Sequence, residues 1–269
     1  ANRLAELYRS FNCPVIVTDL RTAEMIKYAS NAFLATRISF INEIAAICEA
    51  LGADISTVSN GMGLDKRVGP GYLDAGIGWG GSCFPKDVRA LEHMGAVHGA
   101  HPQLLRAVME INRDARRAAV RKLRQALGDL RTRRIAIFGL SFKPNTDDVR
   151  DAPAIEIAHL LTGEGAIVHA YDPVATKNAK LDLGDSVEFF SSPMEAASGT
   201  DAVVLATEWN EFRELDWAEI LKTMRGDVLV DGRNLHKPDR MTDLGYRYFS
   251  MGRTDKNIQA NTKPAVDHA

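Results

Sequence analysis

The chain has 269 residues, of which 45% are hydrophobic and 25% charged, and its formal net charge at pH 7 is −2. These proportions exclude collagen-like, coiled-coil and disordered chains, and the near-neutral charge gives no general attraction to nucleic acid or an anionic membrane. The length predicts about two domains, no apolar run reaches the roughly 20 residues of a membrane span, and no signal peptide opens the chain. Three cysteines, Cys13, Cys48 and Cys83, are too few for a disulfide framework and favour a reducing cytoplasm.

The first 127 residues have the periodicity of helices. The chain begins without Met, in a helical pattern of Leu4, Leu7, Tyr8 and Phe11, so we expect it to begin partway through a larger protein. A short β-branched run at residues 15–17 precedes a long stretch with apolar residues at helical spacing, which ends at a glycine. The pattern predicts helices over residues 23–51, 55–60, 85–94 and 102–127.

Two features of this helical half admit more than one interpretation. Eight of the 21 glycines lie between residues 61 and 81, which predicts a loop that is either ordered or flexible. The last helix carries arginines at positions 113, 116, 117, 121 and 124. They could form a nucleic-acid surface, but a solvated face opposite an apolar stripe is the better interpretation.

From Gly128 onward, strand-like runs alternate with helical segments. Helices are expected over residues 154–161, 193–197 and 217–224, and strands over residues 134–138, 167–171, 202–206, 228–230 and 246–249. This alternation predicts a parallel, doubly wound sheet. The expected fold is therefore α/β, with an all-helical domain over residues 21–127 followed by a Rossmann-like domain over residues 128–269.

One segment matches the dinucleotide fingerprint G-x-G-x-x-G by spelling alone. It is Gly76-Ile-Gly78-Trp-Gly80-Gly81, but no strand precedes it and a proline follows four residues later, so we reject it. The turn Phe138-Gly139-Leu140, with Asp172 at the end of the next strand, is better placed but carries one glycine instead of three. It is a weak signal of a nucleotide site.

The segment Gly80-Gly81-Ser82-Cys83-Phe84-Pro85-Lys86-Asp87 indicates a reactive cysteine. If Pro85 starts a helix, Cys83 lies just before its N-terminus, where unpaired N–H groups and the helix dipole favour a thiolate. Asp87, four residues further on, could place its carboxylate near the sulfur and hold a water molecule. A buried, unreactive cysteine is the alternative, and the glycines before Cys83 and the helix after it argue against that alternative.

Three basic residues are expected at one edge of the sheet. Lys143 and Arg150 follow the first strand and Arg233 follows a later one, and ligands bind at the carboxyl ends of parallel strands, so these residues are placed to contact phosphate. Lys27 and Asn31 share one face of the long helix, where spacing alone favours ordinary surface residues. We infer no metal site, because the seven histidines lack ligand spacing.

Three segments together resemble the UDP-glucose/GDP-mannose dehydrogenase family. They run from Ala23 to Leu34, from Gly78 to Asp87, and over Phe142-Lys143 with Arg150, and the resemblance spans nearly the whole chain. The residues on either side of Cys83 are most similar to the members that oxidise UDP-glucose. The resemblance implies a helical dimerisation domain, a UDP-binding domain, and the NAD-dependent, four-electron oxidation of UDP-glucose to UDP-glucuronate in the cytoplasm.

The resemblance also implies a division of catalytic roles. Cys83 would form first a thiohemiacetal and then a thioester with C6 of the sugar. Lys27 and Asn31 would stabilise the oxyanion that forms when the thiolate adds to the aldehyde. Asp87 would position or activate the water that hydrolyses the thioester.

The implied binding residues are more numerous. Lys86 and Arg150 would approach NAD, and Arg67 would reach the substrate of a partner subunit in a homodimer or a higher homo-oligomer. The other residues implied for binding UDP-glucose are Tyr72, Leu73, Asp74, Gly78, Trp79, Gly80, Phe142, Lys143 and Arg233.

One departure from the family is large. Its members begin with a domain that binds NAD through G-x-G-x-x-G, and residues 1–20 resemble only the last helix and strand of that domain. We therefore expect that the 269 residues alone do not turn over UDP-glucose. The alternatives are a dehydrogenase for another nucleotide sugar (GDP-mannose or a UDP-N-acetylhexosamine) and a non-catalytic fragment that dimerises and binds UDP.

Overall fold

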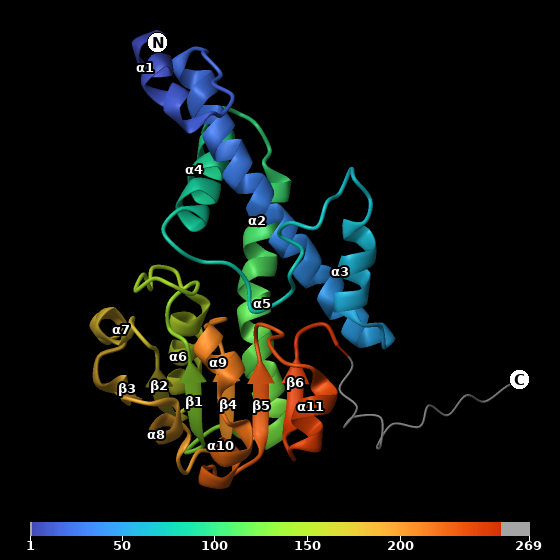
Figure 1. The fold of residues 1–269 in the computed structure, drawn as a ribbon, viewed down its shortest axis with the longest axis vertical. Coiled ribbons are helices and arrows are strands. Elements are labelled where there is room, and N and C mark those ends of the chain that lie inside the picture. Colours follow the sequence, from blue (N-terminus) through green and yellow to red (C-terminus); the bar gives the residue numbers. More distant parts are fainter. Residues whose placement is uncertain (1, 254–269) are drawn as a thin grey trace, which may run out of the picture.

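The computed structural model describes residues 2–253, so Ala1 and residues 254–269 of the expected second domain lie outside the described residues. Helices make up the first half of the described chain and a six-stranded sheet lies in the second half (Figure 1). None of the described helices is both long and apolar enough to cross a membrane. The prediction of an α/β fold, helical first and with a parallel sheet afterwards, is confirmed.

The N-terminal segment contains the expected helix but not the expected strand. Helix α1 (Asn2–Leu7) continues into the 3-10 turn η1 (Tyr8–Phe11). Residues 15–17, expected as a strand, have no regular secondary structure, and their side chains are 46–74% exposed. A β-branched run becomes a strand only where another strand pairs with it, and none of the described strands does so.

The long helix α2 (Leu20–Leu51) begins three residues earlier than predicted. Its first turn is fixed by Asp19, whose carboxylate accepts a hydrogen bond from the Thr22 N–H at 3.0 Å. It ends at Gly52, whose φ of 76° lies in the left-handed region that suits glycine. Polar capping at one end and glycine at the other thus set the length of the longest helix.

Three further helices pack around α2, namely α3 (Ile55–Gly63), α4 (Phe84–Val97) and α5 (Gln103–Leu127). Helix α5 is shared by the two halves of the molecule: Val108 packs in a small cluster with residues of α2 and α4, and Leu123 packs in the core beneath the sheet. Figure 1 shows α5 (green) passing from the other helices down to the sheet. The two halves are therefore joined by a continuous helix.

The sheet has the order β3-β2-β1-β4-β5-β6, and all its strands are parallel. The five predicted strands are present within one residue at each end, whereas the edge strand β3 was missed because it has only three residues. The strands are β1 (Arg134–Phe138), β2 (Ile167–Tyr171), β3 (Val187–Phe189), β4 (Ala202–Leu205), β5 (Val228–Asp231) and β6 (Arg247–Ser250).

Helices cover both faces of the sheet, because alternate strand residues point to opposite sides. Ile135 and Ile137 of β1 pack in one core, and Ala136 and Phe138 pack in the other. The first core is covered by α5, α6 (Pro153–Gly163) and α7 (Thr176–Leu183), and the second by α8 (Pro193–Ala197), α9 (Asn210–Glu214), α10 (Trp217–Thr223) and α11 (Pro238–Asp243).

The strand order reverses between β1 and β4. In open parallel sheets, ligands bind in the crevice that forms outside the carboxyl ends of the strands at such a reversal. The loops that follow β1, β4 and β5 leave the sheet on the side that faces the helical half (Figure 1). This topology places a candidate site between the two halves.

Candidate functional site

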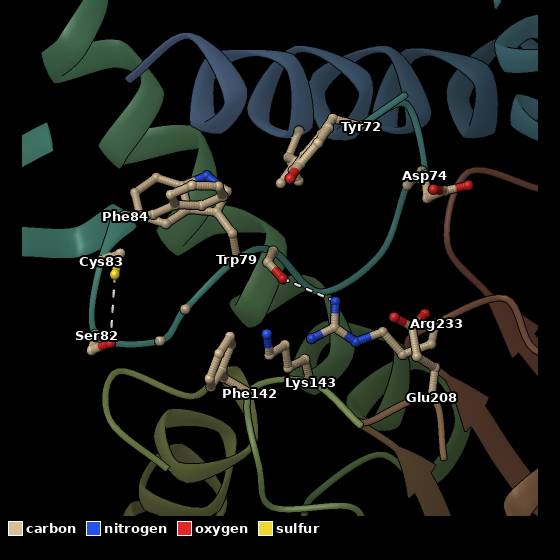
Figure 2. Close-up of a pocket in the computed structure, with 15 residues that line it drawn as sticks. Tyr72, Asp74, Trp79, Ser82, Cys83, Phe84, Phe142, Lys143, Glu208 and Arg233 are labelled. Carbon is tan, nitrogen blue, oxygen red and sulfur yellow. Dashed lines mark hydrogen bonds between the residues drawn. The ribbon is translucent and has the colours of Figure 1, made fainter. Parts of the chain in front are cut away.

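A cavity of about 520 Å³ lies between the helical half and the carboxyl ends of the strands. Figure 2 shows Cys83 at one end of it and Arg233 and Glu208 at the other, with Phe142 and Lys143 between them. Eight of the ten residues expected to bind substrate line this cavity: Tyr72, Asp74, Gly78, Trp79, Gly80, Phe142, Lys143 and Arg233.

The glycine-rich loop is ordered, and its glycines allow backbone segments to approach closely. A Cβ on Gly76 would lie 2.7 Å from the Gly232 carbonyl oxygen, and one on Gly80 would collide with the carbonyl of Asp151. The Ile77 N–H donates to that same Gly232 oxygen at 3.0 Å. The glycines therefore fit the loop against the sheet domain, and the rejection of this segment as a dinucleotide turn agrees with the structure.

The thiol of Cys83 is exposed at the N-terminus of α4. Pro85 occupies the first turn of this helix, as predicted, and the Asp87 N–H donates to the Cys83 carbonyl at 2.9 Å. The sulfur lies 3.7 Å from the hydroxyl oxygen of Ser82. Cys83 is therefore not a buried cysteine, since its side chain is exposed and lines the cavity at a helix start. The reactivity of the thiol stays a prediction.

Three donors converge on the buried carboxylate of Asp87, whose side chain is 0% exposed. Lys27 and Asn31 both donate to Oδ2, and Lys86 donates to Oδ1 at 2.6 Å. Burial raises the pKa of Asp87, but these hydrogen bonds outweigh it and lower the pKa to about 2. The Lys27 side chain is 53% exposed, yet Lys27 and Asn31 both donate to this buried carboxylate, a contact that spacing alone did not predict.

Two basic residues line the cavity, Arg233 at the end opposite Cys83 and Lys143 between the two ends. Arg233 donates from Nε to the Ala206 carbonyl at 2.8 Å and from Nη1 to the Gly78 carbonyl at 3.0 Å, so it joins the sheet domain to the glycine-rich loop. Burial lowers the pKa of Arg233, and the nearby charge of Glu208 opposes that shift. Lys143 is exposed, and its Nζ lies 5.3 Å from the centroid of the Phe142 ring.

Two residues expected to bind substrate lie outside the cavity. Leu73 is only 3% exposed and packs in a small core with residues of α2 and α3. Arg67 has a 90% exposed side chain that pairs with Asp65 at 2.6 Å. Leu73 therefore contributes packing in this chain, and Arg67 is free to reach a neighbouring molecule only if it leaves that ion pair.

The turn after β1 is not a dinucleotide cradle. The N–H groups of Leu140 and Ser141 donate to the Asp172 carboxylate at 2.7 and 3.1 Å, so they are not free to hold a pyrophosphate. The groups that fit an anionic dinucleotide are Lys86 and Arg150, whose side chains are 63% and 70% exposed. Their ion pairs with Asp87 and Asp148 raise the pKa of both cations.

Arg116 departs from the expected solvated arginine face. Its side chain is 7% exposed and forms an ion pair with Glu156 of α6, while the neighbouring arginines 113, 117, 121 and 124 are exposed. The preference for a solvated face is therefore wrong for Arg116. Its partner lies 40 residues away, and the sequence pattern carries no signal for that contact.

Sequence reasoning did not assign five of the residues that line the cavity. Of these, Glu208 carries a charge, and its place two residues after a predicted strand end was the signal that could have identified it. The five are Ile38, Gly81, Ser82, Phe84 and Glu208, whereas Ala75 lies within the loop from Asp74 to Gly80 that the resemblance implied for substrate binding.

Two family models match the chain. The central domain of the UDP-glucose/GDP-mannose dehydrogenase family matches residues 21–114, and the UDP binding domain of the same family matches residues 136–238.

Individual relatives agree with these matches. UDP-glucose 6-dehydrogenase TuaD of Bacillus subtilis is 48% identical over 93% of the chain, and the chain covers 54% of that protein. UDP-glucose 6-dehydrogenase of Rhizobium meliloti is 46% identical over 94% of the chain, which covers 58% of it. A solved UDP-glucose dehydrogenase of Pyrobaculum islandicum superimposes with a TM-score of 0.85 at 40% identity, over 94% of this chain and 56% of that one. The chain thus spans little more than half the length of the relatives it matches.

Proposed function

The chain belongs to the UDP-glucose/GDP-mannose dehydrogenase family, and from this premise we propose that it supplies the thiol and the UDP-binding groups for the NAD-dependent oxidation of UDP-glucose to UDP-glucuronate. The observation that carries the proposal is a single cavity with an exposed thiol at one end and basic side chains at the other. The choice of glucose is supported by similarity to proteins named UDP-glucose 6-dehydrogenase.

The basic end of the cavity holds the nucleotide. Arg233 and Lys143 offset the charge of the diphosphate, and the Phe142 ring lies beside Lys143 as an apolar surface. Tyr72 and Asp74 line the opposite wall, on the helical half. With the UDP group held there, the sugar extends toward Cys83.

The chemistry at the other end depends on Cys83. Oxidation of the C6 alcohol removes a hydride and a proton and gives an aldehyde. The thiolate adds to the aldehyde carbon to form a thiohemiacetal, loss of a second hydride gives a thioester, and water cleaves the thioester to release the acid and the thiol. NAD⁺, which Lys86 and Arg150 would contact, would accept one hydride in each of the two oxidations.

Lys27 and Asn31 stabilise the oxyanion that forms at each addition step. Asp87 acts by orienting these two donors. A carboxylate with a pKa of about 2 is a weak base, and both of its oxygens already accept hydrogen bonds. Of the two roles implied for Asp87, we therefore retain the positioning of water and of the donors and discard proton abstraction.

Lys86 and Arg150 contact NAD in this proposal. Both are exposed cations on the same side of the cavity as Cys83, and the charge of the Cys83 thiolate contributes to raising the pKa of each. Their side chains offer positive charge to a bound dinucleotide. They do not replace the backbone turn whose free N–H groups hold a pyrophosphate in a dinucleotide-binding domain. We accordingly retain the prediction that the 269 residues alone do not reduce NAD⁺ with UDP-glucose; NADH formation by the isolated chain would contradict it.

We further propose a homodimer or higher homo-oligomer formed through the central helices, with residues 21–127 as the catalytic and dimerising domain. Along α2, Phe33, Phe40 and Ile47 recur every seven residues and are 62%, 43% and 48% exposed. An apolar stripe of this kind on a 32-residue helix is what a second copy would cover. Arg67 then reaches the partner's substrate from the exposed side of the same half.

Cys83→Ala in the active enzyme tests the covalent mechanism. We expect NADH formation to fall by about 10³-fold or more, with the affinity for UDP unchanged, because the nucleophile is lost while the basic end of the cavity stays intact. Cys13→Ala, at an exposed cysteine that does not line the cavity, is the matched control and should keep the wild-type rate. Wild-type turnover in Cys83→Ala would exclude the thioester.

The choice of sugar and the non-catalytic alternative are tested by substrate comparison. UDP-glucose should give the highest kcat/KM in the active enzyme, above UDP-N-acetylhexosamines and GDP-mannose. A higher kcat/KM for a UDP-N-acetylhexosamine or for GDP-mannose would show that UDP-glucose is not the preferred substrate and would leave the proposed mechanism intact. UDP binding without turnover of any of them would favour a dimerisation and nucleotide-binding module. We place the reaction in the cytoplasm, where the free thiol of Cys83 stays reduced.

A further inference from the structure

Arg116 of α5 contacts both halves of the molecule from a buried position. Its Nη2 donates to the carbonyl of Trp79 at 2.7 Å and to the carbonyl of Asp151 at 3.1 Å, and its Nη1 pairs with Glu156 at the start of α6. A buried guanidinium is costly unless its donors are satisfied. Here both terminal nitrogens are satisfied, by the glycine-rich loop and by the sheet domain, whereas the buried Nε has no hydrogen-bond partner among the described residues.

In the glycine-rich loop, Arg116 contacts Trp79, whose backbone and side chain form further hydrogen bonds. Asn112, one turn before Arg116 on α5, accepts from the Trp79 N–H at 2.8 Å and donates to the Trp79 carbonyl at 3.0 Å. The Trp79 indole N–H donates to the buried hydroxyl of Ser39 at 3.0 Å. A Cβ on Gly78 would collide with the Asn112 side chain. The loop therefore has one position relative to α5.

In the sheet domain, Arg116 contacts Asp151, which also accepts a hydrogen bond from the helical half. Its carbonyl accepts from Arg116, and its carboxylate accepts from Arg89 of α4 at 3.0 Å. Asp151 adopts a φ of 50°, and the preceding carbonyl, that of Arg150, accepts the Gly81 N–H at 2.9 Å. We call Asp151 with Arg89 and Arg116 the Asp151 joint.

Two residues that contact Arg150 and Asp151 lie close to the thiol along the chain. Gly81 is two residues before Cys83, and Arg89 lies on the helix that Cys83 begins. The nucleotide-binding groups Phe142 and Lys143 belong to the same loop after β1 that leads to Asp151. The joint therefore ties the loop that carries the UDP-binding groups to the segment that carries the thiol.

We propose that Arg116, supported by Arg89, is a positioning residue that sets the distance between the nucleotide-binding end of the cavity and the Cys83 thiol. The proposal rests on the proposed function, because it assumes that UDP-glucose spans the cavity. Arg116 contacts neither the substrate nor the reacting atoms; it acts through Trp79 and Asp151. Its loss leaves UDP bound but lets the thiol drift from C6 of the sugar, and a misplacement of about 1 Å costs on the order of 10²-fold in rate.

The variants follow from the geometry. Arg116→Met keeps a long side chain of similar bulk and removes all three contacts, and the Glu156 carboxylate it leaves behind is one-third exposed and stays solvated. Glu156→Gln is the milder second variant, which removes the charge and keeps an oxygen acceptor. Arg113→Met, on the exposed face of the same helix, is the matched control.

Two measurements on this chain need no turnover. In the first, titration calorimetry gives the affinity for UDP-glucose, and peptide-level mass spectrometry follows alkylation of Cys83 by iodoacetamide with and without saturating UDP-glucose. The second is hydrogen exchange of the Gly81 amide, which donates to the Arg150 carbonyl next to Asp151. In the active enzyme, kcat and KM for UDP-glucose complete the set.

For the wild type and Arg113→Met, we expect bound UDP-glucose to slow the alkylation of Cys83 by about tenfold, because a pocket of this kind covers most of its ligand. For Arg116→Met we expect UDP-glucose affinity within about twofold of wild type, little remaining shielding of Cys83, faster exchange at Gly81, and a kcat lower by on the order of 10²-fold with KM nearly unchanged. Glu156→Gln should fall between the two.

Several outcomes overturn the proposal. Full shielding and unchanged Gly81 exchange in folded Arg116→Met exclude a positioning role, and so does a rise in KM with kcat unchanged. If Arg116→Met does not fold, the same criteria apply to Glu156→Gln. A wild-type chain that binds no UDP-glucose overturns the proposed function, and unchanged exchange at Gly81 in the variants separately overturns the positioning role.

Discussion

At the scale of single residues, Asp87 shows how a buried carboxylate holds three donor side chains in place. It is the fully buried carboxylate under Cys83, and its three donors come from two helices, Lys27 and Asn31 from α2 and Lys86 from α4 itself. Spacing predicted that Lys27 and Asn31 share a helix face, and the resemblance predicted that both act at the site. Spacing could not show that Lys27 and Asn31 meet a carboxylate that lies 60 and 56 residues further along the chain, respectively, because no local pattern encodes a contact between helices.

Asp87→Asn should weaken both stability and catalysis. The folded-state pKa of Asp87 is lowered from 3.8 to about 2, so its contribution to stability is fully present above pH 3.8 and is lost as the pH falls through about 2. The variant should therefore be less stable than wild type at pH 7, and the difference should shrink as the pH falls from 4 toward 2. Urea unfolding followed by circular dichroism over that pH range measures it.

The same variant should lower kcat of the active enzyme on the order of 10²-fold, because Lys27 and Asn31 lose the group that orients them toward the oxyanion. A stability difference that stays constant down to pH 2 would contradict the lowered pKa. An unchanged kcat would show that the donors do not depend on Asp87.

At the scale of elements, long periodic segments were predictable and short polar ones were not. The four central helices could be recognised because their apolar residues recur with a helical period. Five of the six strands could be recognised as short apolar runs that alternate with helical segments. Strand β3 and helices α7, α9 and α11 were not predicted; they have three, eight, five and six residues, which leave little or no period to recognise. Helix α8 is as short as α9 and was predicted, and Pro193 in its first turn marks its start. The prediction of a strand over residues 15–17 was wrong because β-branched composition does not show whether another strand pairs with the segment.

Two glycines in the loop between α3 and α4 test whether the loop needs glycine for close packing against the sheet domain or only for flexibility. Gly80→Ala would drive a methyl group into the Asp151 carbonyl, whereas Gly71→Ala meets nothing within 4 Å. We expect Gly80→Ala to lower the free energy of unfolding by about 1–3 kcal/mol, as overpacking does. Gly71→Ala should change it by less than about 0.5 kcal/mol. Thermal or urea unfolding of the pair measures both, and equal effects would exclude a packing role for Gly80.

At the scale of the whole molecule, the candidate site is a property of the two halves together. Cys83 comes from the helical half, Arg233 and Glu208 from the sheet half, and Arg116 and Asn112 from the helix that spans both. The prediction from sequence identified most residues of the site because they occur in compact motifs. It missed Arg116 and Glu208, whose roles depend on how the halves meet.

The association of copies belongs to the same scale. Phe40→Glu places a charge at the middle of the exposed stripe on α2, where Phe40 is 43% exposed, so the fold should tolerate it. If a second copy covers this stripe, burying the unpaired carboxylate there should convert the oligomer to monomers. Light scattering after size exclusion reads the mass. Leu181→Glu, at an 82% exposed residue of α7, is the control and should leave the mass unchanged. An unaltered oligomer in Phe40→Glu would place the interface elsewhere.

The hydrogen bond from Arg233 to the Gly78 carbonyl has a consequence for synthesis on the ribosome. Phe84, at the thiol end of the cavity, precedes Arg233 by 149 residues (233 − 84), which take roughly 8–30 s to translate at typical elongation rates. During that interval the nascent chain carries an exposed thiol with no nucleotide site to cover it. The cavity is therefore complete only after residue 233 has been synthesised and has joined the glycine-rich loop.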